Sequence, residues 1–311
     1  MVGRSAEVRP ARVDRVLGSR LFVAGSMRST GSRLRILAFH GVGDVVAFGR
    51  QLDVVAETSN PVSSGEVCDW LGGRGELPRR AVWITFDDGE PSAVIDAAPA
   101  LAARGIRATV FVCPAFVGGL VRPWWQVVDD ALAAGLAIPD GLDVASLKAL
   151  GDDRRRSVVA SLAAALDSVD ADRRPAGRRV LTFDDLRRWR DLGGDVGSHT
   201  WDHPCLDRCS PEAQRSQIDR AAAWLDEHEL WDRRVFAYPN GSATSAAAEH
   251  LASAGYAAAL LFDHRLVARR ADPLRLSRLR IDAGASDART RAIVGGGHGA
   301  LLAARRRMIG R

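Results

Sequence analysis

The sequence predicts an α/β fold, with a single (β/α) barrel favoured. Several short apolar runs lack a polar–apolar alternation, which is typical of strands buried on both faces. Amphipathic helical segments separate these runs, and the repeated strand–helix units extend over about 250 residues, the usual size of such a barrel. An open doubly wound sheet is the alternative, but no Gly-x-Gly-x-x-Gly turn follows the first strand. The barrel need not contain all eight strands.

The predicted strands and helices alternate along the chain. Strands are expected at 34–39, 81–86, 108–112, 195–197, 235–238 and 257–262. Helices are expected at 48–71 (interrupted at Asn60–Pro61), 91–104, 211–230 and 245–254. Ser63 or Ser64 followed by Glu66 resembles a helix start. From about 126 to 180 the residues are mostly Ala, Leu, Asp and Arg with helical periodicity, which predicts a helical insertion within the same domain.

Both ends of the chain are rich in arginine, and the formal net charge is +5. Residues 1–33 are predicted to form a basic, poorly ordered arm, and residues 284–311 a basic tail. No nucleic-acid-binding motif accompanies this charge, so we expect no nucleic-acid partner. The basic ends leave peripheral contact with a membrane open.

The sequence contains no recognisable signal for secretion or membrane insertion. No apolar run reaches the length of a transmembrane segment, and the first residues lack the apolar part of a secretory signal. The four cysteines are too few and too scattered for a disulfide scaffold. We therefore expect a cytoplasmic protein, with an extracellular or cell-envelope location left open.

The stretch from Ala81 to Gly89 combines a buried strand with two adjacent carboxylates, Asp87 and Asp88. Side chains at the carboxyl end of such a strand face the ligand crevice of an α/β fold. Neighbouring buried carboxylates repel each other, unless a metal ion binds one and leaves the other as a base. The structural alternative is a turn in which an Asp caps the next helix.

A second signal, at 197–204, places His199 and His203 four residues apart after another short strand. One helical turn or a compact loop lets both imidazoles reach one ion, with a carboxylate from another strand as third ligand. Three protein ligands with an open position suit a catalytic metal.

Two further patterns need a structural interpretation. Cys205 and Cys209 allow a closed Cys₂His₂ zinc site with the two histidines, but that site leaves the aspartate pair unexplained. Residues 181–185 nearly repeat the aspartate motif, and Thr182 with Asp185 suffices as a helix cap there.

At these motifs the chain resembles the polysaccharide deacetylases, also called carbohydrate esterase family 4 or the NodB-like homology domain. Thr85–Gly89 (TFDDG) resembles the first family motif, and His199–Thr200–x–x–His203 resembles the second. The similarity extends from about Ile36 to Ile281 and includes the run Phe236–Gly241. It implies a distorted (β/α) barrel of about seven parallel strands. In this chain the barrel domain would span residues 34–283 and include the helical insertion.

The resemblance implies a metal-dependent hydrolase that removes an acetyl group from an N-acetylated sugar, in a polysaccharide or its precursor. Such an enzyme acts on a carbon–nitrogen bond other than a peptide bond. Asp87 would be the general base and a metal-bound water the nucleophile. Asp88, His199 and His203 would hold a divalent metal; this ligand set suits Zn²⁺, and Co²⁺ or Ni²⁺ are alternatives.

The chain departs from the family pattern at two catalytic positions. Many members carry an Arg in the third motif, which orients the catalytic Asp; here the run is Ala237–Asn240, and Arg278 is the candidate replacement. No late Leu-x-His motif supplies a general acid, so His40 is the candidate, with a hydrogen-bonded structural His as the alternative. These departures also leave open a sugar-binding protein that has lost catalysis.

Three residues are expected to contact the acetylated carbohydrate. Tyr238 and Asn240 belong to the third motif, and the backbone N–H of Asn240 is expected to bind the oxyanion. Trp201 lies within the second motif and is the preferred aromatic platform for a sugar ring, ahead of Trp124 and Trp125.

Overall fold

The fold is a distorted (β/α) barrel built on one parallel sheet. A computed structural model describes residues 12–170, 175 and 178–301. The strand order is β7-β6-β5-β4-β3-β1-β8, every neighbouring pair is parallel, and the short β2 pairs with β3 outside this path. The strands are β1 (Arg35–Phe39), β2 (Asn60–Pro61), β3 (Ala81–Phe86), β4 (Ala108–Val112), β5 (Asp195–Ser198), β6 (Val235–Ala237), β7 (Ala258–Leu260) and β8 (Leu279–Arg280).

The strands are buried on both faces, which explains their unbroken apolar runs. In β3, Val82, Ile84 and Phe86 join the core beneath the outer helices. The alternate residues Ala81 and Trp83 belong to a second core inside the barrel. Because side chains alternate along a strand, every second residue of each strand faces the interior.

The segment from Leu276 to Arg280 closes the barrel. The N–H of Leu276 donates to the carbonyl of Ala259 beside β7, and Leu279 in β8 pairs with Leu37 of β1. One short segment therefore joins both edges of the sheet, and we call residues 276–280 the closing segment. The sequence did not predict β8, because two strand residues leave no periodic pattern.

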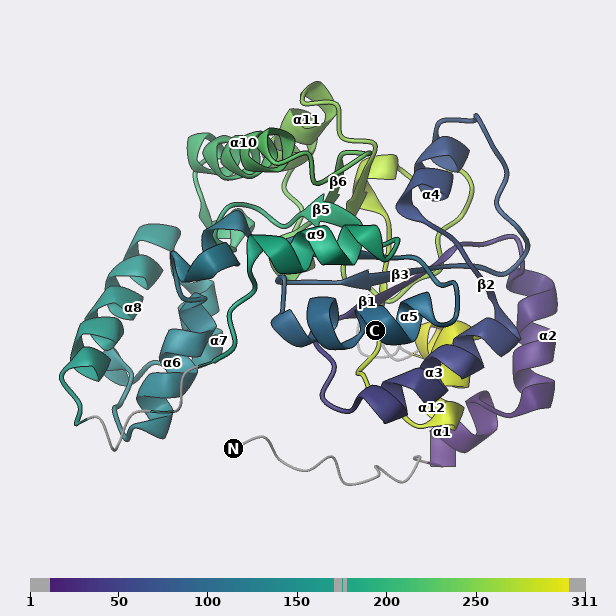
Figure 1. Cartoon of the computed structure of the whole chain (residues 1–311), viewed down its shortest axis with the longest axis horizontal. Coiled ribbons are helices and arrows are strands. Elements are labelled where there is room, and N and C mark those ends of the chain that lie inside the picture. The colour runs from purple at the N-terminus through teal and green to yellow at the C-terminus, as the bar shows by residue number, and fades with distance from the viewer. Residues whose placement is uncertain (1–11, 171–174, 176–177, 302–311) are drawn as a thin grey trace, which may run out of the picture.

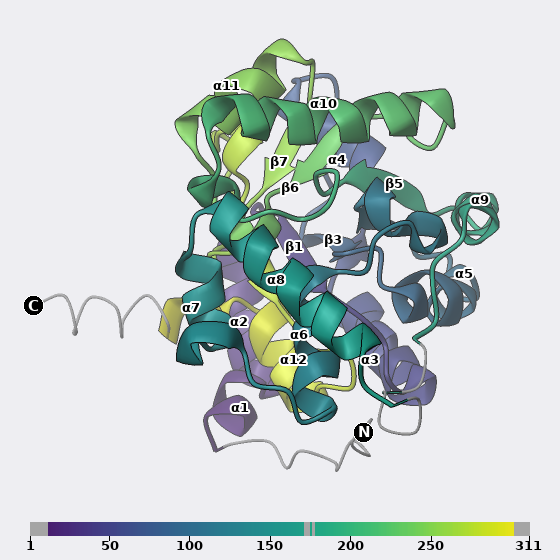
Figure 2. The same ribbon diagram turned by 90° about the vertical axis from the view of Figure 1, so that its left-hand side faces the viewer.

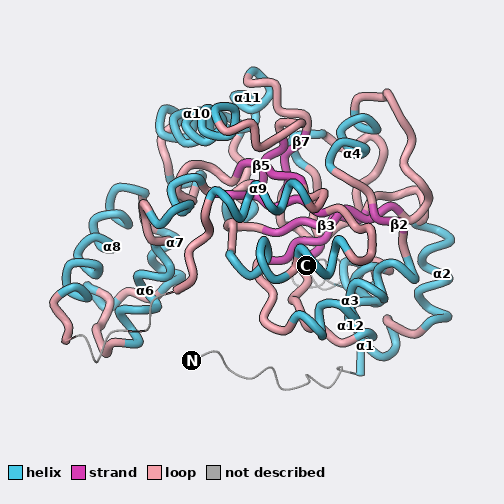
Figure 3. The backbone as a smooth tube through the Cα atoms, in the orientation of Figure 1, coloured by secondary structure: helices cyan, strands magenta, loops and turns pink. Residues whose placement is uncertain are grey.

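Helices cover the outside of the barrel (Figures 1 and 3). They are α3 (Val45–Thr58), α5 (Ala98–Ala102), α9 (Phe183–Asp191), α10 (Pro211–Glu227) and α11 (Ser245–Ser253), whereas α4 (Ser64–Leu71) packs on the inner core through Val67, Cys68 and Trp70. The predicted start of α4 is confirmed, since Ser63 and Glu66 form a capping box. Thr182 and Asp185 cap α9 in the same way, so the repeated aspartate motif is structural.

The predicted helix at 91–104 is interrupted. A π-helical turn at Ser92–Asp96 precedes the short α5, and Pro99 lies at its start. Proline has no N–H to continue a helical ladder, and it is tolerated only in a first turn.

The stretch assigned to a helical insertion contains α6 (Trp124–Ala133), α7 (Val144–Ala149) and α8 (Asp152–Asp167). These helices project to one side of the barrel and share a small apolar core of their own (Figures 1 and 2). Leu147 of α7 is buried in that core, which orients α7 relative to its neighbours. The end of the insertion lies partly outside the described residues.

The prediction of poorly ordered ends is wrong for the described parts. Residues 12–30 form α1 (Arg12–Leu17) and α2 (Arg20–Thr30), and residues 287–294 form α12. The buried side chains of Val23 and Met27 attach α2 to the core. The buried Arg35 guanidinium donates to Val294 O at 2.7 Å and to Thr30 Oγ1 at 2.7 Å, so one side chain ties both ends to β1.

Residues 1–11 and 302–311 lie outside the described part of the chain. None of the described helices combines the length and apolar composition needed to span a bilayer.

Candidate active site

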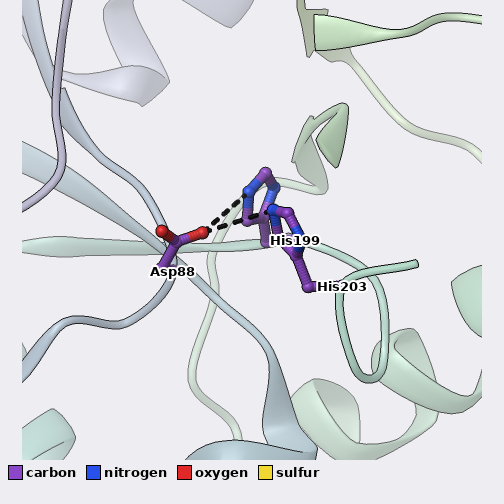
Figure 4. A group of neighbouring side chains, drawn as sticks. All are labelled: Asp88, His199 and His203. Carbon is purple, nitrogen blue, oxygen red and sulfur yellow. Dashed lines mark ion pairs between the residues drawn. The ribbon is translucent and has the colours of Figure 1, made fainter. Parts of the chain in front are cut away.

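Asp88, His199 and His203 converge at the carboxyl ends of β3 and β5 (Figure 4). Asp88 Oδ1 lies 3.4 Å from Nε2 of His199 and 3.4 Å from Nε2 of His203. These three form the only group of three or more His, Cys, Asp or Glu ligand atoms within reach of one ion in residues 12–170, 175 and 178–301. The predicted ligand set is therefore assembled in space.

Strand alternation brings Asp87 and His199 inward. Trp83 faces the barrel interior, so Asp87, four residues later, continues the same face. On β5 the interior position is Gly197, where an added Cβ would lie 2.5 Å from the Phe111 ring, and His199 follows two residues later. Glycine at position 197 thus leaves room for the Phe111 ring inside the barrel. His199 is the next inward-facing residue and lies at the site.

The loops that carry the ligands adopt left-handed backbone conformations. The φ angles are +68° at Asp88, +69° at Thr200 and +57° at His203. Such angles are uncommon for residues other than glycine, and most of all for a β-branched Thr. Strain of this kind is concentrated at functional sites, where surrounding structure holds it in place.

The His199 ring has a fixed orientation. Its Nδ1 lies 2.7 Å from the carbonyl oxygen of Ala237, at the end of β6. A carbonyl can only accept, so Nδ1 carries the proton and Nε2 offers its lone pair towards Asp88. Backbone contacts of this kind are the usual support of a metal-binding histidine.

The spacing of the three ligand atoms fits a divalent cation. Asp88 Oδ1 is buried without a well-formed hydrogen bond, because both imidazole contacts are long, at 3.4 Å. A tetrahedral ion with ligands at about 2.1 Å separates neighbouring ligand atoms by about 3.4 Å. Both separations between Asp88 and the imidazoles therefore match the spacing that such an ion requires.

The protonation states of His203 and Asp88 also suit cation binding. Burial lowers the pKa of His203 to about 4, so its ring is neutral near pH 7. Burial opposes ionisation of Asp88, but its side-chain contact with His199 outweighs burial and holds the pKa of Asp88 below its usual range. A neutral imidazole and an ionised carboxylate are the forms that ligate metals.

Asp87 forms a bidentate ion pair with Arg278 from the closing segment. Nη1 of Arg278 lies 2.6 Å from Asp87 Oδ1, and Nη2 lies 2.8 Å from Oδ2. Both residues are buried, with 3% of Asp87 and 1% of Arg278 exposed. Burial would raise the pKa of Asp87, but the guanidinium lowers it below the usual value. Arg278 itself is held by the carbonyl of Leu261, at 2.9 Å from Nε.

A cavity of about 560 Å³ opens over these groups. Its wall includes both aspartates, both histidines and Arg278, together with His40, Asn240, Trp125, Lys148 and Arg280. The insertion supplies Trp125 from α6 and Lys148 from α7, so Asp88, His199 and His203 line a space bounded partly by the barrel and partly by these helices.

A sequence model of the polysaccharide deacetylase family matches residues 74–140 and 165–259, more than half of the 311 residues. The chain belongs to the polysaccharide deacetylase family. This membership agrees with the convergence of the two motifs in one cavity. A comparison with curated protein sequences gives no match.

Solved deacetylase structures share the fold. The Streptococcus pyogenes deacetylase PplD, in complex with acetate, aligns with a TM-score of 0.58 and 18% identity, over 83% of this chain and 96% of that one. IcaB from Ammonifex degensii aligns with a TM-score of 0.58 and 21% identity, over 85% and 98% of the two chains. The BpsB deacetylase domain from Bordetella bronchiseptica aligns with a TM-score of 0.55 and 16% identity, over 81% of this chain and 97% of that one.

His40 and Asn240 both line the deacetylase cavity. His40 follows the inward-facing positions of β1 and lies edge-on to Phe262, with ring centroids 5.9 Å apart. Asn240 has a φ of +55°, and its Nδ2 donates to Cys205 Sγ at 3.6 Å. The structure thus brings both predicted residues to the site.

Tyr238 does not reach the deacetylase cavity, contrary to the prediction. Val235 and Ala237 of β6 face the barrel interior, so alternation turns Phe236 and Tyr238 to the outer face. Tyr238 is fully buried there, and its hydroxyl donates to Leu274 O at 3.1 Å.

Trp201 also lies outside the cavity. Its ring stacks on Arg220, with the guanidinium carbon 4.2 Å from the ring centroid. Trp125 takes the expected place, because it lines the cavity and its ring centroid lies 4.7 Å from that of His203. The Trp124–Trp125 pair was the available sequence signal for an aromatic surface in the cavity, but a pair of tryptophans is equally typical of a hydrophobic core.

The structural zinc alternative is not supported. Cys205 and Cys209 belong to no ligand group within the described residues, whereas both histidine Nε2 atoms approach Asp88. Cys205 is buried, and Cys209 Sγ donates to the carbonyl of Cys205 at 3.4 Å. Burial raises the pKa of Cys209 to about 12, which disfavours the thiolate that zinc requires.

Proposed function

We propose that this chain hydrolyses the acetyl group of an N-acetylated sugar in a polysaccharide or its precursor. Membership of the polysaccharide deacetylase family supports carbohydrate deacetylation. One observation carries the more specific proposal: Asp87 pairs with Arg278 at 2.6 and 2.8 Å directly beside a group that suits a divalent cation. A base and a cation-binding group thus share one cavity.

Asp87 acts as the general base that removes a proton from the attacking water. Its ion pair with Arg278 keeps the carboxylate ionised and fixes its orientation, although the group is buried. In this arrangement Arg278 is a positioning residue, since it acts through Asp87. It replaces the Arg expected in the third motif.

Asp88, His199 and His203 hold the divalent cation, and two nitrogens with one carboxylate oxygen suit Zn²⁺ first, then Co²⁺ or Ni²⁺. When bound, such a cation polarises the acetyl carbonyl and lowers the pKa of water. Because all three residues line the cavity, a cation held by them would be accessible from it.

Three further residues complete the proposed mechanism. His40 donates a proton to the leaving amine, because it faces the same cavity from the end of β1. The backbone N–H of Asn240 stabilises the oxyanion. Trp125 supplies the aromatic surface for a sugar ring next to the site.

Acetate release from an N-acetylglucosamine oligomer tests this function. Asp87→Asn keeps the size of the side chain and removes the base, so acetate release should fall by about 10²–10⁴-fold. Asp184→Asn is the matched control, because Asp184 occupies the equivalent position in the near-copy of the motif and is exposed. Its activity should equal that of the wild type.

Two outcomes would contradict the proposal. If the wild type binds the oligomer without releasing acetate and Asp87→Asn binds equally well, the chain is a sugar-binding protein. Release of acetate from O-acetylated sugars alone would keep the hydrolase and overturn the N-acetyl substrate.

A further inference from the structure

The active-site cavity carries two basic side chains that the proposed chemistry does not use. Lys148, the only lysine of the chain, enters from α7, and Arg280 enters from β8. We propose that Lys148 and Arg280 bind an acidic group, a carboxylate or a phosphate, on or next to the acetylated sugar. This inference rests on the proposed function and names the substrate class of the same site.

The charges of the cavity are unbalanced. Among the described lining residues, only Asp87 and Asp88 are acidic. Arg278 neutralises Asp87, and Asp88 faces two histidines and the cation-binding position. Neither carboxylate is therefore available to balance Lys148 or Arg280.

The two basic groups also lack strong partners elsewhere. Lys148 forms no ion pair with any described residue. Nε of Arg280 lies 3.5 Å from Oδ1 of Asp282, but the side chains are 57% and 65% exposed, and exposed pairs contribute little. Both groups are free to interact with a ligand.

In a neighbouring hollow the basic side chains are already paired with acidic ones. It contains Arg178 and Arg179 beside Asp88, but each of these arginines already has a close acidic partner. Arg178 lies 3.0 Å from Asp130, and Arg179 lies 3.0 Å from Asp96. Charge therefore favours an acidic ligand in the cavity with Lys148 rather than in this hollow.

The size of the cavity and the reaction itself agree with an acidic substrate. About 560 Å³ lies within the range of small-molecule sites, so a whole sugar with a substituent fits. Hydrolysis adds water across the amide and forms acetate and an amine, which takes up a proton. A positive cavity repels that ammonium product, and an acidic substituent on the substrate offsets the repulsion.

Equilibrium binding of three small ligands tests the inference. N-acetylglucosamine, its 1-phosphate and N-acetylmuramic acid share the N-acetyl group, and differ in carrying no acid, a phosphate or a carboxylate. Calorimetry with zinc-loaded Asp87→Asn/Arg278→Met protein measures binding without turnover, and removing the ion pair as a unit avoids leaving Arg278 as an unpaired cation in the cavity. At least one acidic ligand should bind about tenfold more tightly than the neutral sugar, and added salt should reduce the difference.

The double variant Lys148→Gln/Arg280→Gln should remove this preference. Arg269→Gln is the control, because Arg269 is exposed and does not line the cavity; it should retain the preference. Thermal melting of each variant shows that the fold is intact. Preference for the phosphate alone or the carboxylate alone identifies the acidic group.

Equal affinity for all three ligands, no measurable binding of any, or a preference that survives in the double variant would overturn the inference. Acetate release from neutral oligomers without any acidic preference would leave the proposed function standing. Tight acidic binding with no acetate from any substrate would overturn the hydrolase and keep the acidic-ligand site.

Discussion

The pairing of Asp87 with Arg278 joins two sequence positions that are 191 residues apart. Isolated buried carboxylates are neutral at pH 7, because desolvation disfavours the charged form. The bidentate contact reverses this tendency and lowers the pKa of Asp87. The guanidinium thus allows a buried aspartate to remain ionised.

Arg278→Met should raise the pKa of Asp87, because the strongest effect that opposes burial is then lost. The proposed base must be ionised, so the acidic limb of the pH–activity profile should move to higher pH. Activity at pH 7 should fall by about 10²-fold or more. Steady-state acetate release across pH 5–9 measures both effects. An unchanged acidic limb would contradict the role of Arg278, and Arg269→Met serves as the exposed control.

Trp125 and Trp201 offer a matched pair of tryptophans near the second motif. Trp125 lines the cavity beside His203, whereas Trp201 stacks on Arg220 away from it. Trp125→Ala should raise KM for the oligomer about tenfold through lost aromatic contact. Trp201→Ala should leave KM close to that of the wild type, and the reverse order would restore the original prediction.

The ligand residues were predictable because both motifs directly follow strands. Asp87, Asp88 and His199 come after buried apolar runs, and parallel strands deliver their carboxyl ends to one edge. The predicted substrate contact of Tyr238 was wrong because the sequence does not show which face of the sheet Ala237 occupies. Period-two alternation then places Tyr238 outside the barrel.

Short elements escaped prediction for a different reason. The closing segment pairs with β7 at Leu276 and with β1 at Leu279, so neither contact spans enough residues to leave a pattern. Arg278 lies between these contacts, and this explains how it reaches Asp87. The sequence named Arg278 as the candidate partner of Asp87, and the fold shows the contact between them.

The helix α2 was hidden by its arginines and small residues. Val23 and Met27, four residues apart, were the available signal of a buried face. Ser19 caps the helix, and Arg35 accounts for its attachment at the other end. The arm is therefore part of the folded domain from residue 12 onwards.

Met27→Ala should destabilise the protein by about 2–5 kcal/mol, because it leaves a cavity in the core. Leu21 lies on the same helix but is 88% exposed, so Leu21→Ala should change stability by less than about 0.5 kcal/mol. Chemical denaturation of the two variants measures the difference. Equal, small effects would mean that α2 does not contribute to the core.

At the scale of the molecule, one cavity collects residues from distant parts of the chain. β3 supplies the aspartates, β5 and its loop supply the histidines, and the closing segment supplies Arg278. The insertion adds Trp125 and Lys148. The barrel thus provides the groups to which we assign the reaction, and the insertion provides those to which we assign sugar binding.

Cation binding is the property on which the proposed mechanism depends. Elemental analysis of purified wild-type protein should give about one divalent metal per chain, the number that a single Asp88–His199–His203 group holds. Asp88→Asn should lose the metal, and Cys205→Ser/Cys209→Ser should retain it. Metal that persists in Asp88→Asn and disappears from the cysteine variant would contradict the assignment of the site.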